Sequence, residues 1–254
     1  MGRTSLAISG ALLAGALGLA GQAMAAAGHP SLAGTYVPDT RDQREQVTGN
    51  EPPWKPALKA QSDALAKQEK EGHPFLVLQG CLPHAMPSFM TIMHNAVEIL
   101  ETPGRITMLG EGEGNNLRRI YTDGRKIPTD PDESLFGYSV GHWEGDTLVV
   151  DTTGVAPESF IAVSEGVGLP NNGGMHIVER FHLVGKVLHD DMVIDAPKVL
   201  TKPWHTTRKY TRTDYEIVEG ECARGNFKSG KDKNGNSVLI PRPQKPDGTI
   251  GDAD

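Results

Sequence analysis

The stretch 138–154, YSVGHWEGDTLVVDTTG, decides the fold of this chain. Two runs rich in β-branched and aromatic residues, 138–143 and 147–153, flank the turn Glu144-Gly145-Asp146. Because Gly and Asp tolerate the left-handed backbone angles of a tight turn, this stretch predicts an antiparallel hairpin. Working outward, we find similar strand–turn–strand units on both sides of it.

These neighbouring units extend the hairpin into a longer series. Runs 96–101 and 105–111 flank Pro103-Gly104, which suits a type II turn, and 117–122 ends at Asp123-Gly124. We therefore expect an all-β fold, an antiparallel meander of about eight or nine strands. Closing into a lipocalin-like barrel would hide its edges and leave room for side chains or one small ligand. The remaining expected strands are 175–183, 187–195, 205–212 and 215–221.

The N-terminus is typical of a secretory signal peptide. Arg3 supplies a positive charge, residues 6–20 are apolar, and Ala23-Met24-Ala25 forms an A-x-A cleavage site. A membrane anchor is the alternative, but the apolar run is short for a span and no stop-transfer segment follows. We expect residues 1–25 to be removed and the mature protein to be periplasmic, without insertion in a membrane.

The rest of the chain is organised around the expected barrel domain, 74–223. Residues 26–73 predict a short strand at 32–36, a loop at 39–56 and one helix at 56–72, whose apolar stripe ends at Gly72. Residues 74–87 predict an irregular plug or rim, and 155–174 a long loop. Residues 224–254, rich in Gly, Lys, Asn, Asp and Pro, predict a disordered tail.

Charge and cysteine content narrow the function classes. The 254 residues carry a formal charge of -7, which argues against binding to nucleic acid or to a membrane surface. The two cysteines of an exported chain, Cys81 and Cys222, predict one disulfide. Two buried free thiols are the alternative, and a catalytic cysteine is disfavoured because no basic neighbour is evident.

The two-residue loop Gly185-Lys186 fixes the register of its hairpin and gathers polar side chains on one face. If that face lines the lumen, His176 acts as general base and Asp195, directly opposite, orients it. The alternative, which the hairpin alone favours, is a solvated outer face with cross-strand charge pairs. The other face is apolar apart from Glu179 and Asp190. The remaining facing pairs are His182 with His189 and Arg180 with Asp191.

Other polar groups lie inside predicted strands and suggest further roles. Glu98 is either a second acid/base or a structural partner of Arg118 or Arg119. Tyr121 is either a proton donor or a core aromatic with a satisfied hydroxyl. Together, Arg119 and Tyr121 could hold an oxyanion. We expect the substrate-binding residues to be Arg119, Arg180, His142 and Trp204.

Motifs for cofactors and metals are missing from the sequence. Among nine His there is no H-x-H or H-E-x-x-H, and Gly112-Glu113-Gly114 does not complete a dinucleotide fingerprint. A zinc site of His182, His189 and Asp191 stays open as an alternative. No G-x-S-x-G nucleophile motif occurs. We therefore expect no cofactor and no metal.

Several short motifs together resemble a large family of exported bacterial β-rich proteins. The resemblance spans about 81–222 and implies export and a lipocalin-like β-fold, without an established catalytic residue to carry over. His84-Ala85 stands where a glycine is expected, and His142 stands where Arg is expected. The motifs are CLPHAMP (81–87), EILETPGRI (98–106), RRIYTDGR (118–125), GHWEGDTLVVDTTG (141–154), ERF (179–181) and KPW (202–204).

Strand-embedded acids, bases and hydroxyls without a cofactor motif favour cofactor-independent acid–base chemistry. The sequence thus predicts a periplasmic barrel that binds a small hydrophobic or aromatic molecule and acts as a lyase or isomerase. A carrier that leaves its ligand unchanged is the first alternative. An envelope assembly module that uses the loop 155–174 is the second.

Overall fold

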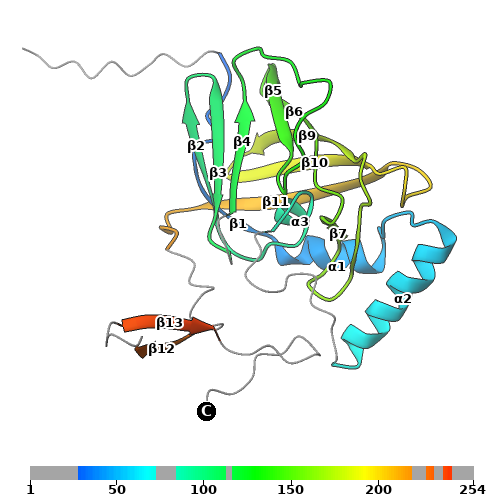
Figure 1. Ribbon diagram of the computed structural model, residues 1–254. Coiled ribbons are helices and arrows are strands. Elements are labelled where there is room, and N and C mark those ends of the chain that lie inside the picture. The colour runs from blue at the N-terminus through cyan, green and yellow to red at the C-terminus, as the bar shows by residue number, and fades with distance from the viewer. Residues whose placement is uncertain (1–27, 73–83, 113–115, 219–226, 232–236, 242–254) are drawn as a thin grey trace, which may run out of the picture.

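The computed structural model describes residues 28–72, 84–112, 116–218, 227–231 and 237–241. Nine of the described strands close into a barrel in the order β1-β11-β10-β9-β6-β5-β4-β3-β2, which confirms the all-β barrel (Figure 1). Its strands are β1 Gly34–Pro38, β2 Val97–Thr102, β3 Arg105–Gly110, β4 Asn116–Tyr121, β5 Tyr138–Glu144, β6 Thr147–Thr153, β9 His176–Val184, β10 Val187–Asp195 and β11 Trp204–Thr213.

The turn residues set the predicted hairpins. Gly145, at φ 60° with open space around it, turns β5 into β6, so that Glu144 lies opposite Thr147. Gly185, at φ 63°, does the same for β9 and β10. The register predicted for that hairpin is confirmed, with His176 opposite Asp195.

One pairing of the barrel differs from an antiparallel meander. Strands β4 and β5 are parallel and share a short ladder, in which Ile120 lies opposite Ser139 and Tyr121 opposite Val140. Parallel neighbours need a crossover between them, and residues 122–137, predicted as a loop, provide it. The barrel is therefore mixed.

Strand β1 closes the barrel. It pairs antiparallel with β11 on one side and with β2 on the other. The strand expected in the N-terminal region 26–73 is thus part of the barrel, so the boundary expected before residue 74 does not separate it from the β-domain. Closure leaves no unpaired sheet edge at this seam.

The described part of the region 26–73 contains two helices, rather than the one expected. Helix α2, Pro56–Lys70, falls in the range predicted as helical, whereas α1, Thr40–Thr48, replaces the expected loop. The Asp39 side chain caps α1 by accepting from the Arg41 backbone N–H at 3.0 Å. Figure 1 shows α1 below β11, while α2 points away from the barrel. A short helix, α3 Ser88–Thr91, follows.

Three further predictions change in the structure. Residues 155–174 contain a small hairpin, β7 Phe160–Ala162 with β8 Gly168–Pro170. Residues 215–218 are not a strand. Within 224–254, β12 Phe227–Lys231 pairs with β13 Ser237–Pro241, and the rest of the predicted tail lies outside the described residues. The signal segment 1–25, Cys81 and Cys222 lie outside the described residues.

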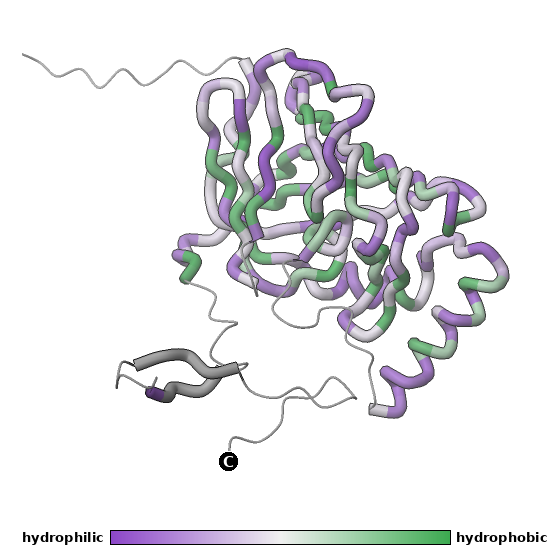
Figure 2. The backbone as a smooth tube through the Cα atoms, viewed as in Figure 1, coloured by the Kyte–Doolittle hydropathy of each residue, from purple (hydrophilic) through white to green (hydrophobic). Residues whose placement is uncertain are grey.

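Side chains alternate between the inside and the outside of the barrel. Figure 2 shows hydrophobic and hydrophilic residues alternating along the strands. Ile177 and Phe181 on β9 and Leu188 and Met192 on β10 are buried in one core, together with Phe89 of α3. No helix in the described ranges is long and apolar enough to cross a membrane.

Candidate functional site

Within the described ranges, four Arg, Asp or Glu side chains are fully buried, and all of them belong to inward-facing strand positions. Arg118 on β4, Glu179 on β9, Asp190 on β10 and Arg208 on β11 each have 0% exposure. Ionisable groups are rarely buried unless they are paired or functional. We therefore take this interior polar cluster as the candidate functional site.

Half of the cluster is a closed ion pair. Arg118 Nη1 donates to Glu179 Oε1 at 2.8 Å, and Arg118 Nη2 donates to Glu179 Oε2. The second nitrogen also contacts Thr152 Oγ1 at 3.1 Å and Ser139 Oγ at 3.4 Å. A forked arginine–carboxylate contact of this kind fixes both side chains. Arg118 and Glu179 thus largely satisfy each other.

The other half, Asp190 and Arg208, is open in the sense that its terminal polar atoms are unpaired in the described chain. Asp190 lies directly opposite Arg208 in the β10–β11 register. Arg208 Nε donates to Met90 O at 3.2 Å, but its Nη1 and Nη2 have no hydrogen-bond partner in the described part of the chain. Neither carboxyl oxygen of Asp190 has a partner among those residues. Two terminal guanidinium nitrogens and a carboxyl group are therefore buried inside the barrel without a hydrogen-bond partner in the described chain.

The surroundings of Asp190 favour its neutral form. Burial, and then the negative charge of Glu179, raise the pKa of Asp190 well above its ordinary value, while Arg118 and Arg208 oppose the shift. A neutral carboxyl group can donate a hydrogen bond as well as accept one. Near it, Glu179 forms the forked contact with Arg118. The two carboxyl groups thus have different environments, one paired with an arginine and the other without a partner in the described chain.

Helix α3 positions the open half of the cluster. The carbonyl oxygen of Met90, in α3, accepts from Arg208 Nε and from the Tyr210 hydroxyl at 2.6 Å. Burial raises the pKa of Tyr210, so its hydroxyl stays a donor. With Nε fixed by Met90, the guanidinium of Arg208 has little freedom to turn its other nitrogens away.

The predicted general base lies elsewhere. His176 Nε2 is 2.9 Å from Asp151 Oδ1 on β6, and the His176 side chain is 45% exposed. The next residue, Ile177, is fully buried, so the polar face of this hairpin points outward. The lumenal placement expected for His176 and Asp195 is therefore wrong, and the solvated outer face is correct. Asp195 lies opposite His176 in register, but the acid that His176 contacts is Asp151.

Two predicted substrate-binding residues, Arg180 and His142, both contact the carboxylate of Glu144 on the protein surface. Arg180 Nη2 donates to Glu144 Oε2 at 2.8 Å, and His142 Nε2 lies 3.2 Å from Glu144 Oε1. Arg180 and, to a smaller extent, His142 lower the pKa of Glu144. Both residues therefore lie on the outer surface, apart from the interior cluster.

Arg119 and Tyr121 line a cavity of about 520 Å³ on the outer side of the β4–β5 junction. The ring of Tyr121 lies 5.4 Å from that of Tyr138, with the Arg125 guanidinium 3.9 Å from its centroid. Arg119 itself is exposed. The structure thus brings these two predicted residues together, but not with the interior cluster.

The last two predicted site residues, Glu98 and Trp204, lie in the barrel wall, and in the described chain neither is hydrogen-bonded to the interior cluster. Glu98 is half-buried on β2, opposite Thr35. Of its two expected partners, Arg118 bonds Glu179 instead, and Arg119 lines the outer cavity, so neither forms an ion pair with Glu98 in the described chain. Trp204 is buried, and its Nε1 donates to Asn50 O at 3.0 Å, which ties the start of β11 to the chain after α1.

The alternative zinc site has a loose geometry. The rings of His182 and His189 stack with centroids 5.0 Å apart, and His182 Nδ1 is 3.7 Å from Asp191 Oδ2. Burial and the neighbouring His182 lower the pKa of His189. Within the described ranges, no group of three or more His, Cys, Asp or Glu is arranged to hold a metal ion.

The residues of the interior cluster left a signal in the sequence. Glu179 and Asp190 are the charged exceptions on the otherwise apolar face of a hairpin whose register the turn fixes. Arg118 and Arg208 likewise lie two positions before buried Ile120 and Tyr210, on the same face of their strands. A charge at an inward position, rather than a histidine at an outward one, identifies the site.

No protein-family model matches this chain, and no significant match was found among curated proteins. The resemblance to exported β-rich proteins therefore rests on the short motifs alone.

Proposed function

We propose that this protein binds one small molecule inside its barrel, with the polar head group of the ligand held by Arg208 and Asp190. The single observation that carries the proposal is the set of fully buried groups without hydrogen-bond partners in the described chain. Leaving a buried donor or acceptor unpaired costs about 1–3 kcal/mol, and more for a charged group. A ligand that completes these bonds would recover that free energy on binding.

The charges of the cluster favour an anionic head group. Arg118 and Glu179 neutralise each other, so a neutral Asp190 leaves one positive charge on Arg208. A carboxylate or phenolate oxygen would accept from both terminal nitrogens of Arg208 and from the Asp190 hydroxyl. The apolar neighbours Phe181, Leu188 and Met192 favour a hydrophobic or aromatic body.

The same geometry supports a second candidate, cofactor-independent acid–base catalysis by a lyase or isomerase. It is favoured by the different environments of Asp190 and Glu179, which suit a proton donor beside a carboxylate. In this proposal the catalytic acid is Asp190, while His176, Glu98 and Tyr121 lie on other parts of the barrel wall. We propose a periplasmic location because of the charged, apolar and A-x-A segments at the N-terminus.

The assembly hypothesis has less support. It assigned partner binding to the loop 155–174. Ile161, Val163 and Leu169 are instead buried in the core. The interior site is the stronger basis for a function.

Calorimetric titration of the mature protein with benzoate, 4-hydroxybenzoate and dodecanoate tests the binding proposal. We expect binding of at least one probe, and at least about tenfold weaker binding by Arg208→Met, a loss of about 1.4 kcal/mol. His176→Ala, on the outer face, is the control and should bind like the unsubstituted protein. Equal binding by Arg208→Met would remove the head-group assignment.

Analysing the probe after incubation with the protein distinguishes catalysis from binding alone. A carrier returns it unchanged, whereas an enzyme converts it, and Asp190→Asn would then abolish conversion while retaining binding. If Arg208→Met does not fold, as judged by circular dichroism, Asp190→Leu provides the binding test. Conversion that persists in Asp190→Asn would exclude Asp190 as the acid.

A further inference from the structure

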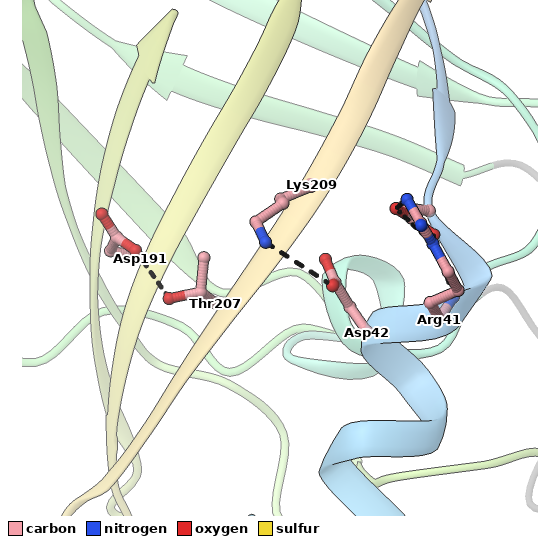
Figure 3. A network of polar contacts seen from close by, with 6 residues as sticks. Arg41, Asp42, Asp191, Thr207 and Lys209 are labelled. Atoms are coloured by element: carbon pink, nitrogen blue, oxygen red, sulfur yellow. Dashed lines mark hydrogen bonds and ion pairs between the residues drawn. The ribbon is translucent and has the colours of Figure 1, made fainter. Parts of the chain in front are cut away.

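A second polar cavity lies on the outside of the barrel. It is a groove of about 460 Å³ between α1 and the outer face of β9, β10 and β11. Asp42 and Gln46 line it from α1, and Asp191, Thr207 and Lys209 line it from the strands. Figure 3 shows Lys209 directed across this space towards Asp42, with Asp191 and Thr207 beside it. None of these residues belongs to the interior cluster.

The helix wall of the groove contains buried polar groups that are not satisfied. Asp42 is 7% exposed and Gln46 is 2% exposed. Asp42 Oδ2 and both Gln46 amide atoms, Oε1 and Nε2, lack a hydrogen-bond partner in the described chain. Residues four apart share one face of a helix, so both side chains are presented together to the strands. A helix that only packed on a sheet would bury apolar residues there.

The strand floor continues this arrangement. Thr207 Oγ1 donates to Asp191 Oδ1 at 2.6 Å, and Lys209 Nζ lies 4.0 Å from Asp42 Oδ1. Burial raises the pKa of Asp42, with Lys209 opposing the shift. Across the groove, the carboxyl group of Asp191 is therefore followed by the hydroxyl of Thr207, the ammonium of Lys209 and the carboxyl group of Asp42. The amide of Gln46 lies one helical turn from Asp42.

This alternation selects one class of ligand. An anion would be repelled by Asp191, Glu45 and Asp42, and a cationic amine would be repelled by Lys209 and Arg180, which also line the groove. A hydroxyl group can donate to Asp42 Oδ2 while it accepts from Gln46 Nε2. Two adjacent hydroxyls would satisfy the carboxyl and the amide at once.

We propose that the groove between α1 and β9–β11 binds a neutral polyhydroxylated molecule of the mono- or disaccharide class. Its volume lies in the range typical of small-molecule sites. Val178 and Val193 on the floor supply apolar surface for the C–H faces of a sugar ring. The proposal does not depend on the interior site.

Saturation-transfer NMR and calorimetry with D-glucose, D-galactose and trehalose test it, with putrescine and acetate as charged probes. We expect at least one sugar to bind more tightly than either charged probe. Gln46→Met, which keeps the shape but removes the amide, should weaken sugar binding at least about tenfold. Its thermal midpoint should not fall, because the amide has no partner to lose.

Gln68→Met, the same substitution at an exposed position of α2, is the matched control and should leave sugar binding unchanged. If Gln46→Met does not fold, Lys209→Met supplies the same readout from the strand side. The proposal is overturned if no sugar binds, if only a charged probe binds, or if a folded Gln46→Met or Lys209→Met variant binds sugar normally. Arg208→Met should not affect this groove.

Discussion

Replacing Asp190 with leucine should stabilise the protein at neutral pH. The two side chains have the same number and connectivity of heavy atoms, so the substitution replaces the carboxyl group by an apolar group of similar length. Asp190 is fully buried, and its oxygens have no partner in the described chain. An unpaired buried polar group costs about 1–3 kcal/mol, which gives the size of the expected gain in the free energy of unfolding.

The gain should depend on pH. Because burial raises the pKa of Asp190, the folded state holds a proton that the unfolded state has released above about pH 3.9. The folded state binds more protons, so its stability falls as the pH rises through this window and up to the folded-state pKa. Leucine does not titrate. The advantage of Asp190→Leu should thus be largest at pH 7 and should shrink towards pH 4.

Urea unfolding of both proteins at pH 7 and pH 4 measures the two effects. For a domain of this size, we expect a rise of about 3–10 °C in the midpoint of thermal unfolding at pH 7. Asp195→Leu, on the outer face of the same strand, is the control and should change stability by less than about 0.5 kcal/mol. If Asp190→Leu destabilises the fold equally at both pH values, the carboxyl group is paired and the reasoning fails.

Three further outcomes test the same structure. Arg118→Met alone should lower the free energy of unfolding by about 3–5 kcal/mol, because it leaves the buried carboxylate of Glu179 unpaired. The double variant Arg118→Met with Glu179→Leu should recover most of that loss. Additive losses of the two substitutions in urea unfolding would contradict this. Burial lowers the pKa of His84 to about 4, so up to about 3 kcal/mol of stability should be lost as the pH falls from 6.5 to 4. His84→Gln should remove that loss, and an unchanged pH dependence would show that another group causes it. Gly137→Ala, whose new Cβ would lie 2.6 Å from Thr153 O, should lower the thermal midpoint more than Gly145→Ala, where the surrounding space is open; equal shifts would argue against the close approach.

Local turn chemistry is what made the hairpins predictable. Gly145 and Gly185 both have positive φ, and each fixes the pairing of the strands on either side of it. The predicted cross-strand neighbours of His176 and His182 follow from that alone. Barrel closure was also accessible, since a meander of this length has edges to hide.

Non-local or polar packing was not predictable in the same way. Helix α1 buries Asp42, Gln43 and Gln46 rather than an apolar stripe, so hydrophobic periodicity gives no signal for it. The parallel β4–β5 pairing depends on the path of the crossover 122–137, which has no local turn code. Helix α1 and the β4–β5 pairing both depend on tertiary contacts, which local sequence patterns do not predict.

The site shows how a correct register can still give the wrong face. Alternation along β9 and β10 divides the residues into two sets, but it does not say which set points inward. The apolar residues decide this, because burying Ile177, Phe181 and Leu188 stabilises the fold, whereas burying His176 would not. The set that contains them is inside, and it carries Glu179 with it.

The two proposed sites follow from this alternation, because they lie on opposite faces of the same strands. Asp190 and Arg208 point into the barrel, while Asp191, Thr207 and Lys209, each next to one of them in sequence, point into the outer groove. A one-residue slip between β10 and its neighbours would exchange the two sets, so both proposals require the register that Gly185 fixes. In a barrel sequence, a charged residue with buried apolar residues two positions away on each side is therefore a better marker of an interior site than a histidine–aspartate pair. Asp190, between Leu188 and Met192, meets that criterion, and His176 does not.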